Sequence, residues 1–304
     1  MSSSTPDPIH RAESVADAAK FDWETKLLRD VVDYGARLIE KFVEGRTIGH
    51  TEACLIVLAA QSIAMADAAE VLVSAGTADA ARVPARSLFE AQLYAQWILA
   101  KDTDHRALCW WAHVKRRERD DLASHVATTS EGKAVSQLFA DAGMPVPRIH
   151  DSSRQPDAIA RLAQLDARCL KAPWSSIKET REWYQAADAN NIREVARGAK
   201  QEHLFAFFYK PFCRDVHSSN VERWLEFGGG TQQVRGIRTL RGIRLLLQFT
   251  IPLMFQLYEA LIDRFLHAEK ANYVQMRRTW GPCLSKVREP DYKDPPPPPG
   301  VAGT

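Results

Sequence analysis

The chain has 304 residues, of which 45% are hydrophobic and 26% are charged, and its formal net charge is +2. These values are ordinary for a globular protein and exclude wholesale disorder. The net charge is too small to indicate nucleic-acid or membrane binding by itself. The five cysteines are scattered and form no C-x-x-C pair, so they predict no disulfide framework. The polar start, Met1 to Ser14, lacks the apolar core of a secretory signal, and we expect a cytoplasmic protein.

Helical periodicity dominates the first half of the sequence, and hairpin signals of the N-G or D-G type are absent. We therefore predict an all-α, antiparallel multi-helix bundle with essentially no β-sheet. Glycines or turn residues mark where each early helix ends. The predicted early helices are Ser14 or Asp17 to Val43, Thr51 to Gly76, Ala78 to Ala100, and a fourth that begins at Asp104.

In the second half of the sequence, helical periodicity is interrupted more often by proline, glycine and asparagine. Residues 143–153 predict a connector, and the next helix spans Ala158 to Leu170. A further helix is expected to open at Trp174 or Ser175, and another is expected to end or kink at Pro211. Residues 228–230 are three glycines, which predict a flexible joint. We expect a disordered N-terminus over 1–13, one helical domain over 14–288, and a disordered proline-rich tail over 289–304.

One apolar stretch, Ile243 to Ile262, is long enough to resemble a membrane span. It contains Arg244, Gln248 and Glu259, which are too polar for a lone helix that faces lipid. A core helix or a dimer-interface helix is the better interpretation, and we expect a homodimer that does not cross a membrane.

The helix around Ala85–Ala100 is apolar over most of its circumference, yet Arg82, Arg86 and Glu90 recur at four-residue steps on one face. Buried charges need partners, because an unpaired charge in a low-dielectric interior is costly. Two interpretations stay open at this point. The residues form an internal ion pair that orients helices, or they line a polar pocket.

His217 follows the proline-broken helix that contains Tyr209. Histidine titrates near neutral pH and can act as a general base, so His217 is a catalytic candidate together with Arg86 and Glu90. The alternative is a structural histidine that bonds a backbone carbonyl or Glu90.

Three segments carry a family resemblance: RSLFE, which ends at Glu90; APWSSIKETREWY, which contains Trp174; and Tyr209-x7-His217-x-Ser219. Together they resemble DUF5677, a bacterial family of helical domains of unknown function, over about Thr51 to Asn220. The resemblance implies a helical fold and a cluster of Arg86, Glu90 and His217, without an activity. The chain departs from the family pattern where a serine is expected three or four residues before the histidine, because Cys213 and Arg214 stand there.

The HEPN class of helical RNases carries an arginine and then a histidine after four to six residues. Arg119 and His125 give the best match to this pattern, because the polar Asp120 follows the arginine. The spacing is expected by chance in a chain so rich in arginine, and a solvated helix end explains this segment as well. The pattern occurs three times: Arg106/His113, Arg119/His125 and Arg197/His203.

The C-terminal part of the chain is basic: ten Lys or Arg against three acidic residues lie between Arg235 and Arg288. Four arginines three residues apart predict a helical spiral that can bind anions: Arg235, Arg238, Arg241 and Arg244. A solvated or internally paired face is the alternative, as is docking of these helices on the acidic remainder of the chain.

The sequence contains no Walker A loop, no dinucleotide-binding glycine motif, no G-x-S-x-G and no H-E-x-x-H, so we expect no metal and no cofactor. Two functional hypotheses remain. The first is a binding or interaction module with a polar core cluster. The second is a HEPN-like RNase or toxin-type effector of a bacterial defence system, which would act on RNA.

Overall fold

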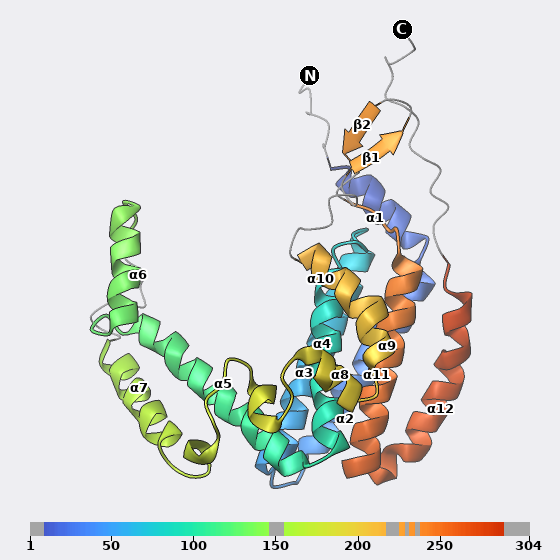
Figure 1. Ribbon diagram of the computed structural model, residues 1–304. Coiled ribbons are helices and arrows are strands. Elements are labelled where there is room, and N and C mark those ends of the chain that lie inside the picture. Colours follow the sequence, from blue (N-terminus) through green and yellow to red (C-terminus); the bar gives the residue numbers. More distant parts are fainter. Residues whose placement is uncertain (1–8, 146–154, 217–224, 229–230, 235–237, 289–304) are drawn as a thin grey trace. The chain divides into compact units, whose positions relative to one another are not determined.

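The computed structural model describes residues 9–145, 155–216, 225–228, 231–234 and 238–288. Helices account for most of this part of the chain, which confirms the predicted all-α class (Figure 1). The strands within it are a short antiparallel pair, β1 (Leu225–Gly228) and β2 (Thr231–Val234), in which Leu225 pairs with Val234.

Contacts group the chain into two compact units. Unit 1 contains residues 1–47, 56–97 and 199–304, and unit 2 contains residues 48–55 and 98–198. Two continuous helices, α3 (His50–Ser74) and α4 (Arg82–Ala100), have residues in both units. A compact unit is not the same as an independently folding domain, so the single domain predicted over 14–288 stays a prediction.

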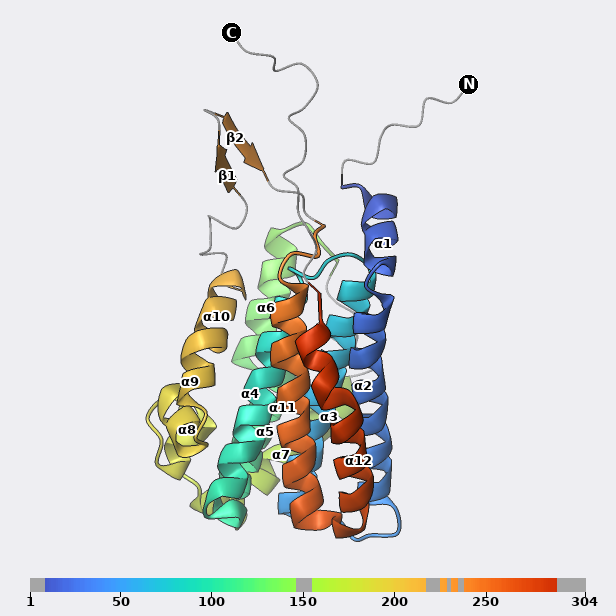
Figure 2. The same ribbon diagram turned by 90° about the vertical axis from the view of Figure 1, so that its right-hand side faces the viewer.

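Unit 1 is a bundle of long helices that run beside α3 and α4 (Figures 1 and 2). The other helical elements of unit 1 are α1 (Arg11–Ala19), α2 (Asp22–Val43), α9 (Glu202–Leu204), η4 (Phe205–Tyr209), α10 (Lys210–Val216), α11 (Ile243–Phe265), η6 (His267–Glu269), α12 (Lys270–Trp280) and η7 (Gly281–Lys286).

The centre of unit 1 is α11, whose buried residues lie around most of the helix. It packs directly against α2, because Gly35 leaves room for the ring of Tyr258. The Tyr258 hydroxyl donates a hydrogen bond of 2.9 Å to the carbonyl oxygen of Val31. α11 also contacts α12, where the Tyr273 hydroxyl donates to the carbonyl oxygen of Phe255 at 2.8 Å. Within unit 1, the stretch Ile243–Ile262 is thus a core helix, as the sequence indicated.

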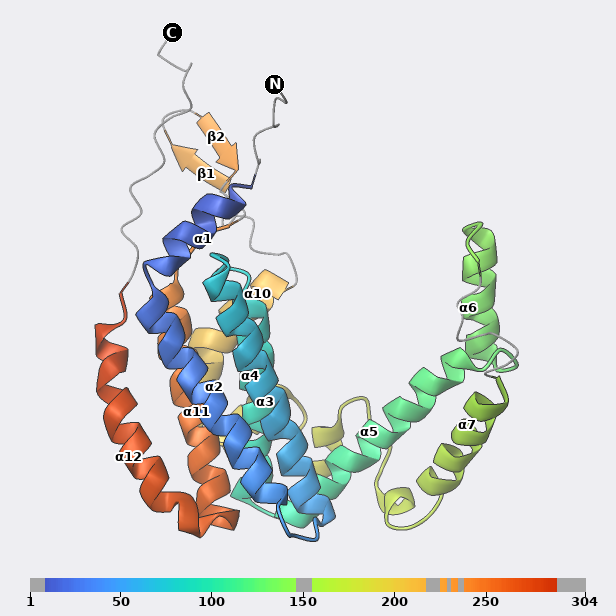
Figure 3. The same ribbon diagram turned by 180° about the vertical axis from the view of Figure 1, so that it is seen from behind.

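Polar bonds connect the remaining long helices of unit 1. Arg29 on α2 pairs with Glu70 on α3, and Figure 3 shows these two helices side by side. Gln92 on α4 is fully buried, and its amide donates to the side chain of Gln256 on α11 at 3.4 Å. These bonds tie α3 and α4 to the helices that precede and follow them in the sequence.

Unit 2 is built on α5 (Thr103–His125), which contacts α6 (Ser130–Asp141), α7 (Gln155–Cys169) and η3 (Trp183–Ala187). The unit also contains η2 (Trp174–Ser176) and α8 (Ile192–Gly198). Arg116 on α5 connects this helix to the segment after α7. The Arg116 guanidinium donates hydrogen bonds to the carbonyl oxygens of Trp174, Ile177 and Lys178. One arginine thus holds the irregular segment that follows α7.

The start of the chain differs from the prediction of one helix up to Val43. The helix is interrupted at Lys20 and Phe21, and Phe21 has a non-helical backbone with φ −113° and ψ 23°. This break places the Phe21 ring in the core, where it is 8% exposed. Helix α1 begins at Arg11, so the predicted disorder over 1–13 is wrong for its last three residues.

Two predictions for the second half are also corrected, the one for Pro211 only in part, because that proline does not end the helix. Only a short 3₁₀ turn, η2, forms at Trp174. The chain stays helical past Pro211 to Val216, and the preceding turn η4 is π-helical. A π turn changes the backbone hydrogen-bond pattern, and such turns accommodate a residue that lacks an N–H. Gly228 is the last residue of β1 and pairs with Thr231, whereas Gly229 and Gly230 of the predicted joint lie outside the described residues.

Two helices in the described residues, α3 and α11, are long and apolar enough to cross a membrane when judged by length and composition. Core helices of soluble proteins pass the same test, which makes it weak evidence. In α11, 67% of the apolar window is buried inside the protein, against 39% in α3.

Candidate functional site

The face of α4 that was singled out from the sequence carries an ion pair. Leu88 and Phe89 point into the core and are fully buried. Arg86 and Glu90 are four residues apart and therefore lie on one face of the helix. The Arg86 Nη1 to Glu90 Oε2 distance is 3.2 Å, and the two side chains are 21% and 27% exposed.

The second side of the site comes from the helical run that ends in α10. Tyr209 closes the π-helical turn η4, and Cys213 lies one turn further on α10. Arg86 donates from Nη2 to the Tyr209 hydroxyl at 2.9 Å and from Nε to the Cys213 sulfur at 3.2 Å. Its guanidinium also lies 5.0 Å from the centre of the Tyr209 ring, a favourable cation–π distance.

Glu90 is held from a second direction. The Tyr94 hydroxyl, one helical turn further along α4, donates to Glu90 Oε1 at 2.9 Å. Both carboxylate oxygens and all three guanidinium nitrogens of Arg86 therefore have protein partners. We call Arg86, Glu90, Tyr94, Tyr209 and Cys213 the Arg86 cluster.

Arg86 and Tyr209 each keep one protonation state at physiological pH. Burial lowers the pKa of Arg86, but the hydrogen bond to Cys213 and the charge of Glu90 outweigh it, and the net shift is upward. Burial and the charge of Glu90 raise the pKa of Tyr209 well above its usual value. Arg86 stays charged and Tyr209 stays neutral, so neither group exchanges a proton near pH 7. This arrangement fits an internal connection between α4 and α10 rather than an acid–base pair.

Sequence reasoning found only part of this cluster. Arg86 and Glu90 were recognised because their spacing is local. Tyr94 was missed, although its spacing of four residues from Glu90 is the same signal. Tyr209 and Cys213 are likewise four residues apart, but nothing in the sequence reveals that they face Arg86. His217 lies just beyond the end of α10, outside the described residues.

The structure does not bring Arg119 and His125 together. Both lie on α5, which is continuous from Thr103 to His125. Six residues on an α-helix turn through 600°, which leaves the two side chains about 120° apart around the axis. Arg119 is instead bonded to Asp120, at 2.7 and 2.9 Å, and lies 4.0 Å from Glu179. The side chain of Arg119 is only 28% exposed, and the solvated helix end that the sequence allowed stays a prediction.

The prediction that Arg235, Arg238, Arg241 and Arg244 lie on one helix is wrong. Gly242 has a left-handed backbone, with φ 79°, and it caps α11, which begins only at Ile243. Arg238 precedes the helix and donates to the carbonyl oxygen of Ala75 at 3.0 Å. Arg241 is in a turn and Arg244 is in the first turn of α11, both exposed, and Arg235 lies outside the described residues. Their predicted role in anion binding stays a prediction.

Within the described residues, no group of three or more His, Cys, Asp or Glu side chains is arranged to hold a metal ion. Two of the five cysteines, Cys54 and Cys109, are buried, and burial raises the pKa of both thiols. Neither is therefore a thiolate at neutral pH.

Comparison with known proteins gives one match. A model described as "Family of unknown function (DUF5677)" matches residues 52–227, more than half of the chain. The matched segment contains every member of the Arg86 cluster, whereas α2, α11 and α12 lie outside it. Searches of curated proteins and of solved structures found no match.

Proposed function

Because this chain belongs to the DUF5677 family of unknown function, whose description supplies no activity, we propose a function from its geometry. The chain is an interaction module that binds a phosphate-bearing polyanion at one end of unit 1, and the Arg86 cluster is its internal scaffold. The observation that carries this proposal is the gathering of arginines at the end of unit 1 where α4 and α11 begin.

Three segments converge at that end. Arg238 bonds the carbonyl oxygen of Ala75, which follows α3. Arg82, in the first turn of α4, lies beside Gly242 at the start of α11. Its guanidinium also lies 5.9 Å from the centre of the Phe212 ring on α10. We call Arg82, Arg238, Arg241 and Arg244 the arginine end.

The electrostatics of the arginine end favour an anion. Arg82 is in the first turn of α4 and Arg244 is in the first turn of α11, and the helix dipoles add partial positive charge at these N-termini. Asp79 pairs with Arg82 at 3.2 Å. Guanidinium groups bind phosphate oxygens in a bidentate geometry, so a phosphate backbone matches this end.

The Arg86 cluster supports this surface indirectly. It joins α4, whose first turn supplies Arg82, to α10, whose Phe212 lies against the Arg82 guanidinium. Because all the nitrogens of Arg86 are engaged by the protein, Arg86 itself is not offered as a ligand-binding group. In this proposal the Arg86 cluster positions α4 and α10, and the arginine end binds the polyanion.

The test is binding of a fluorescent single-stranded RNA, followed by anisotropy at 50 to 200 mM salt. Arg241→Gln with Arg244→Gln removes two exposed cations from the arginine end. A matched control, Arg264→Gln with Arg278→Gln, removes two exposed cations on α11 and α12 and changes the net charge equally. The first pair should weaken binding by roughly tenfold and reduce the salt slope by about 1.4, at about 0.7 per lost phosphate contact.

The control pair should leave both affinity and slope nearly unchanged. A third variant, Arg241→Lys with Arg244→Lys, should retain most of the binding, because it keeps the charge. Equal losses in the glutamine pair and the control pair would reveal a general charge effect and reject the arginine end. Absence of RNA binding by the wild type at low salt would reject the proposed function altogether.

A second candidate, the RNase, gains no support from the described residues. The spacing that suggested it places Arg119 and His125 on different sides of α5, and Arg119 is bonded to Asp120. The same RNA can be checked for cleavage in the binding experiment. We expect it to stay intact.

A further inference from the structure

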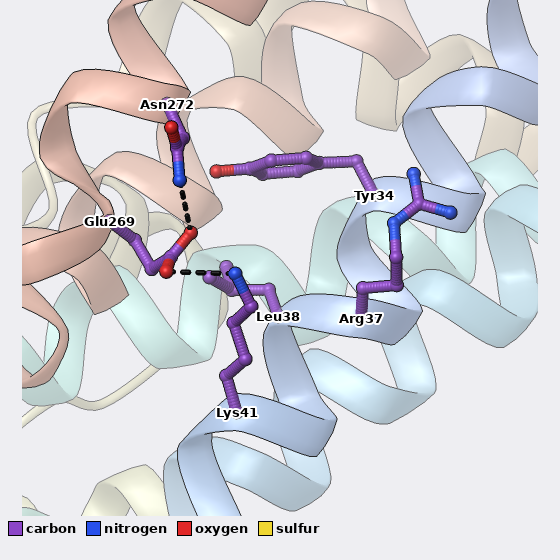
Figure 4. Close-up of a pocket in the computed structure, with 6 residues that line it drawn as sticks. All are labelled: Tyr34, Arg37, Leu38, Lys41, Glu269 and Asn272. Atoms are coloured by element: carbon purple, nitrogen blue, oxygen red, sulfur yellow. Dashed lines mark hydrogen bonds and ion pairs between the residues drawn. The ribbon is translucent and has the colours of Figure 1, made fainter.

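A small pocket between α2 and the start of α12 is a joint between these helices (Figure 4). Lys41 pairs with Glu269 at 2.8 Å, and Asn272 donates to the other carboxylate oxygen of Glu269 at 3.1 Å. These hydrogen bonds lower the pKa of Glu269, so its carboxylate is ionised and bound to the protein itself. A surface whose binding groups face solvent lies elsewhere in unit 1, on the run formed by α9, η4 and α10.

The inner face of this run is aromatic and fixed against the long helices. Phe205, Tyr209 and Phe212 are buried, with exposed fractions of 6%, 6% and 3%. The Phe212 ring lies 5.5 Å from the ring of Phe249 on α11. Figure 2 shows α9 and α10 to one side of α4 and α11. Because the inner face is packed, the outer face is held in a defined position.

The outer face presents Phe207 to solvent. Among the side chains that the structure describes, Phe207 is the most exposed aromatic residue, at 69%, and the next is Trp23, at 42%. The Phe207 ring lies 5.0 Å from the ring of Phe208, in a T-shaped arrangement. Phe208 in turn stacks on Phe249 at 4.2 Å. Phe207 is therefore an exposed aromatic surface that the core supports from behind.

Cations surround this ring. Lys210 and Arg214 are both exposed, and their spacing of four residues places them on one face of α10. Phe207 precedes them by about one and about two helical turns, so it lies near the same side of the run. From Lys200 to Arg214 the sequence has three Lys or Arg and one acidic residue, Glu202. We call Phe207, Lys210 and Arg214 the Phe207 face.

The Phe207 face begins beside the arginine end. Phe212, two residues before Arg214, lies 5.9 Å from the Arg82 guanidinium. Phe207 is five residues from Phe212, which is about 7.5 Å along a helix axis at 1.5 Å per residue. One chain of phosphates can therefore reach from the arginine end to Phe207.

An exposed aromatic ring among cations matches single-stranded nucleic acid better than the other polyanions or a membrane. Proteins bind single strands by stacking bases on aromatic rings while cations bind the phosphates. A helix that lies on a membrane needs a broad apolar face, whereas the large apolar side chain exposed here is Phe207 alone, with Ala206 beside it.

We propose that the Phe207 face binds single-stranded nucleic acid, with one base stacked on Phe207 and phosphates paired with Lys210 and Arg214. This inference rests on the function proposed above and names its partner. It adds a requirement that the arginine end does not have, because the bases must be unpaired for one of them to stack on the ring.

The test measures binding of the full chain to a fluorescent single-stranded RNA at several salt concentrations. Phe207→Ala should weaken binding by roughly tenfold and leave the salt slope unchanged, because a stacked ring binds no phosphate. Phe207→Leu keeps an apolar side chain and should lose as much, whereas Phe207→Trp should retain the affinity. Leu138→Ala is the matched control, since it removes a side chain that is 64% exposed on α6. A melting curve checks that each variant is folded.

Two further ligands separate stacking from charge. Phe207→Ala should bind duplex RNA and inorganic polyphosphate like the wild type, since neither offers an unpaired base. Lys210→Gln with Arg214→Gln should weaken binding of all three ligands, and it should reduce the salt slope for the single strand by about 1.4.

The outcomes distinguish this inference from the proposed function. Loss of RNA binding in Arg241→Gln with Arg244→Gln, but not in Phe207→Ala, would overturn the inference and leave the proposed function standing. Absence of RNA binding by the wild type would reject both. An equal loss of polyphosphate binding in Phe207→Ala would overturn base stacking. If Phe207→Ala released the protein from phosphatidylserine vesicles without changing its RNA affinity, the face would belong to a membrane instead.

Discussion

The contact between Gly35 and Tyr258 gives the sharpest test of how unit 1 is packed. Gly35 lies on α2, where alanine would ordinarily stabilise the helix by about 1 kcal/mol. A Cβ atom at Gly35 would instead lie 2.7 Å from Cζ and 2.9 Å from Cε1 of Tyr258, and closer still to its hydroxyl oxygen. Carbon atoms in ordinary contact are about 3.5–4.0 Å apart, so Tyr258 must shift.

The cost of Gly35→Ala follows from that shift. Tyr258 is fully buried, and its ring can retreat only by straining the core, which costs about 1–3 kcal/mol. The hydrogen bond from Tyr258 to Val31 is also lost, at about 1 kcal/mol. After the gain in helix propensity of about 1 kcal/mol, the net destabilisation is about 2 kcal/mol. We expect a melting temperature lower by about 4 °C or more.

Thermal or urea unfolding of four proteins tests the reasoning: wild type, Gly35→Ala, Tyr258→Leu and the double variant. The smaller leucine makes room for the alanine, so the double variant should be more stable than the sum of the single changes by about 1 kcal/mol or more. Gly281→Ala is the control, because an alanine Cβ there meets no atom within 4 Å. A neutral Gly35→Ala, or strict additivity, would refute the packing argument.

Two other predictions concern the ion pair between Glu24 and Arg288 in unit 1 and the hydrogen bonds of Arg116 in unit 2. Burial raises the pKa of Glu24, but hydrogen bonds from Arg288 lower it below its usual value, so Glu24 stabilises the fold above about pH 4.3 and loses this contribution as the pH falls through its folded pKa. The melting temperature of the wild type should exceed that of Glu24→Gln at pH 7, and the difference should shrink as the pH falls through the lowered pKa of Glu24. A constant difference would contradict the linkage. In unit 2, Arg116→Gln removes up to three bonds to backbone carbonyls and should speed tryptic cleavage between Lys171 and Arg181 severalfold, with Arg117→Gln on the same helix as the control. Unchanged cleavage would mean that Arg116 does not hold this segment.

Much of the fold was predictable because its signals are local. Gly45 and Gly76 follow α2 and α3, as glycines that end helices should, and both have a left-handed backbone. The apolar stretch from Ile243 predicted a core helix, since its polar residues are too many for lipid. The Arg86–Glu90 pair follows from four-residue spacing alone. Each of these features depends on residues within one or two helical turns.

The features that sequence reasoning missed depend on contacts far along the chain. Phe21 interrupts the first helix because its ring enters a core built by later elements. Pro211 was expected to end or kink a helix, and the chain instead stays helical to Val216 after a π turn. Cys213 was noted only as a departure from the family pattern, and its bond to Arg86 spans 127 residues. No local pattern contains that information.

Hydrogen–deuterium exchange of Arg86→Ala is the most direct test of the central claim, that the Arg86 cluster is a scaffold which joins α10 to α4. Helix α10 has seven residues, too few to be stable without tertiary contacts. Loss of the bonds from Arg86 should therefore speed exchange over Lys210–Val216 by roughly tenfold or more, at about 1.5–3 kcal/mol for hydrogen bonds to a charged group. Exchange in α2 and α12 should stay as in the wild type. Unchanged protection of α10, with the protein folded, would contradict the scaffold and return Arg86 to the candidates for a reactive site.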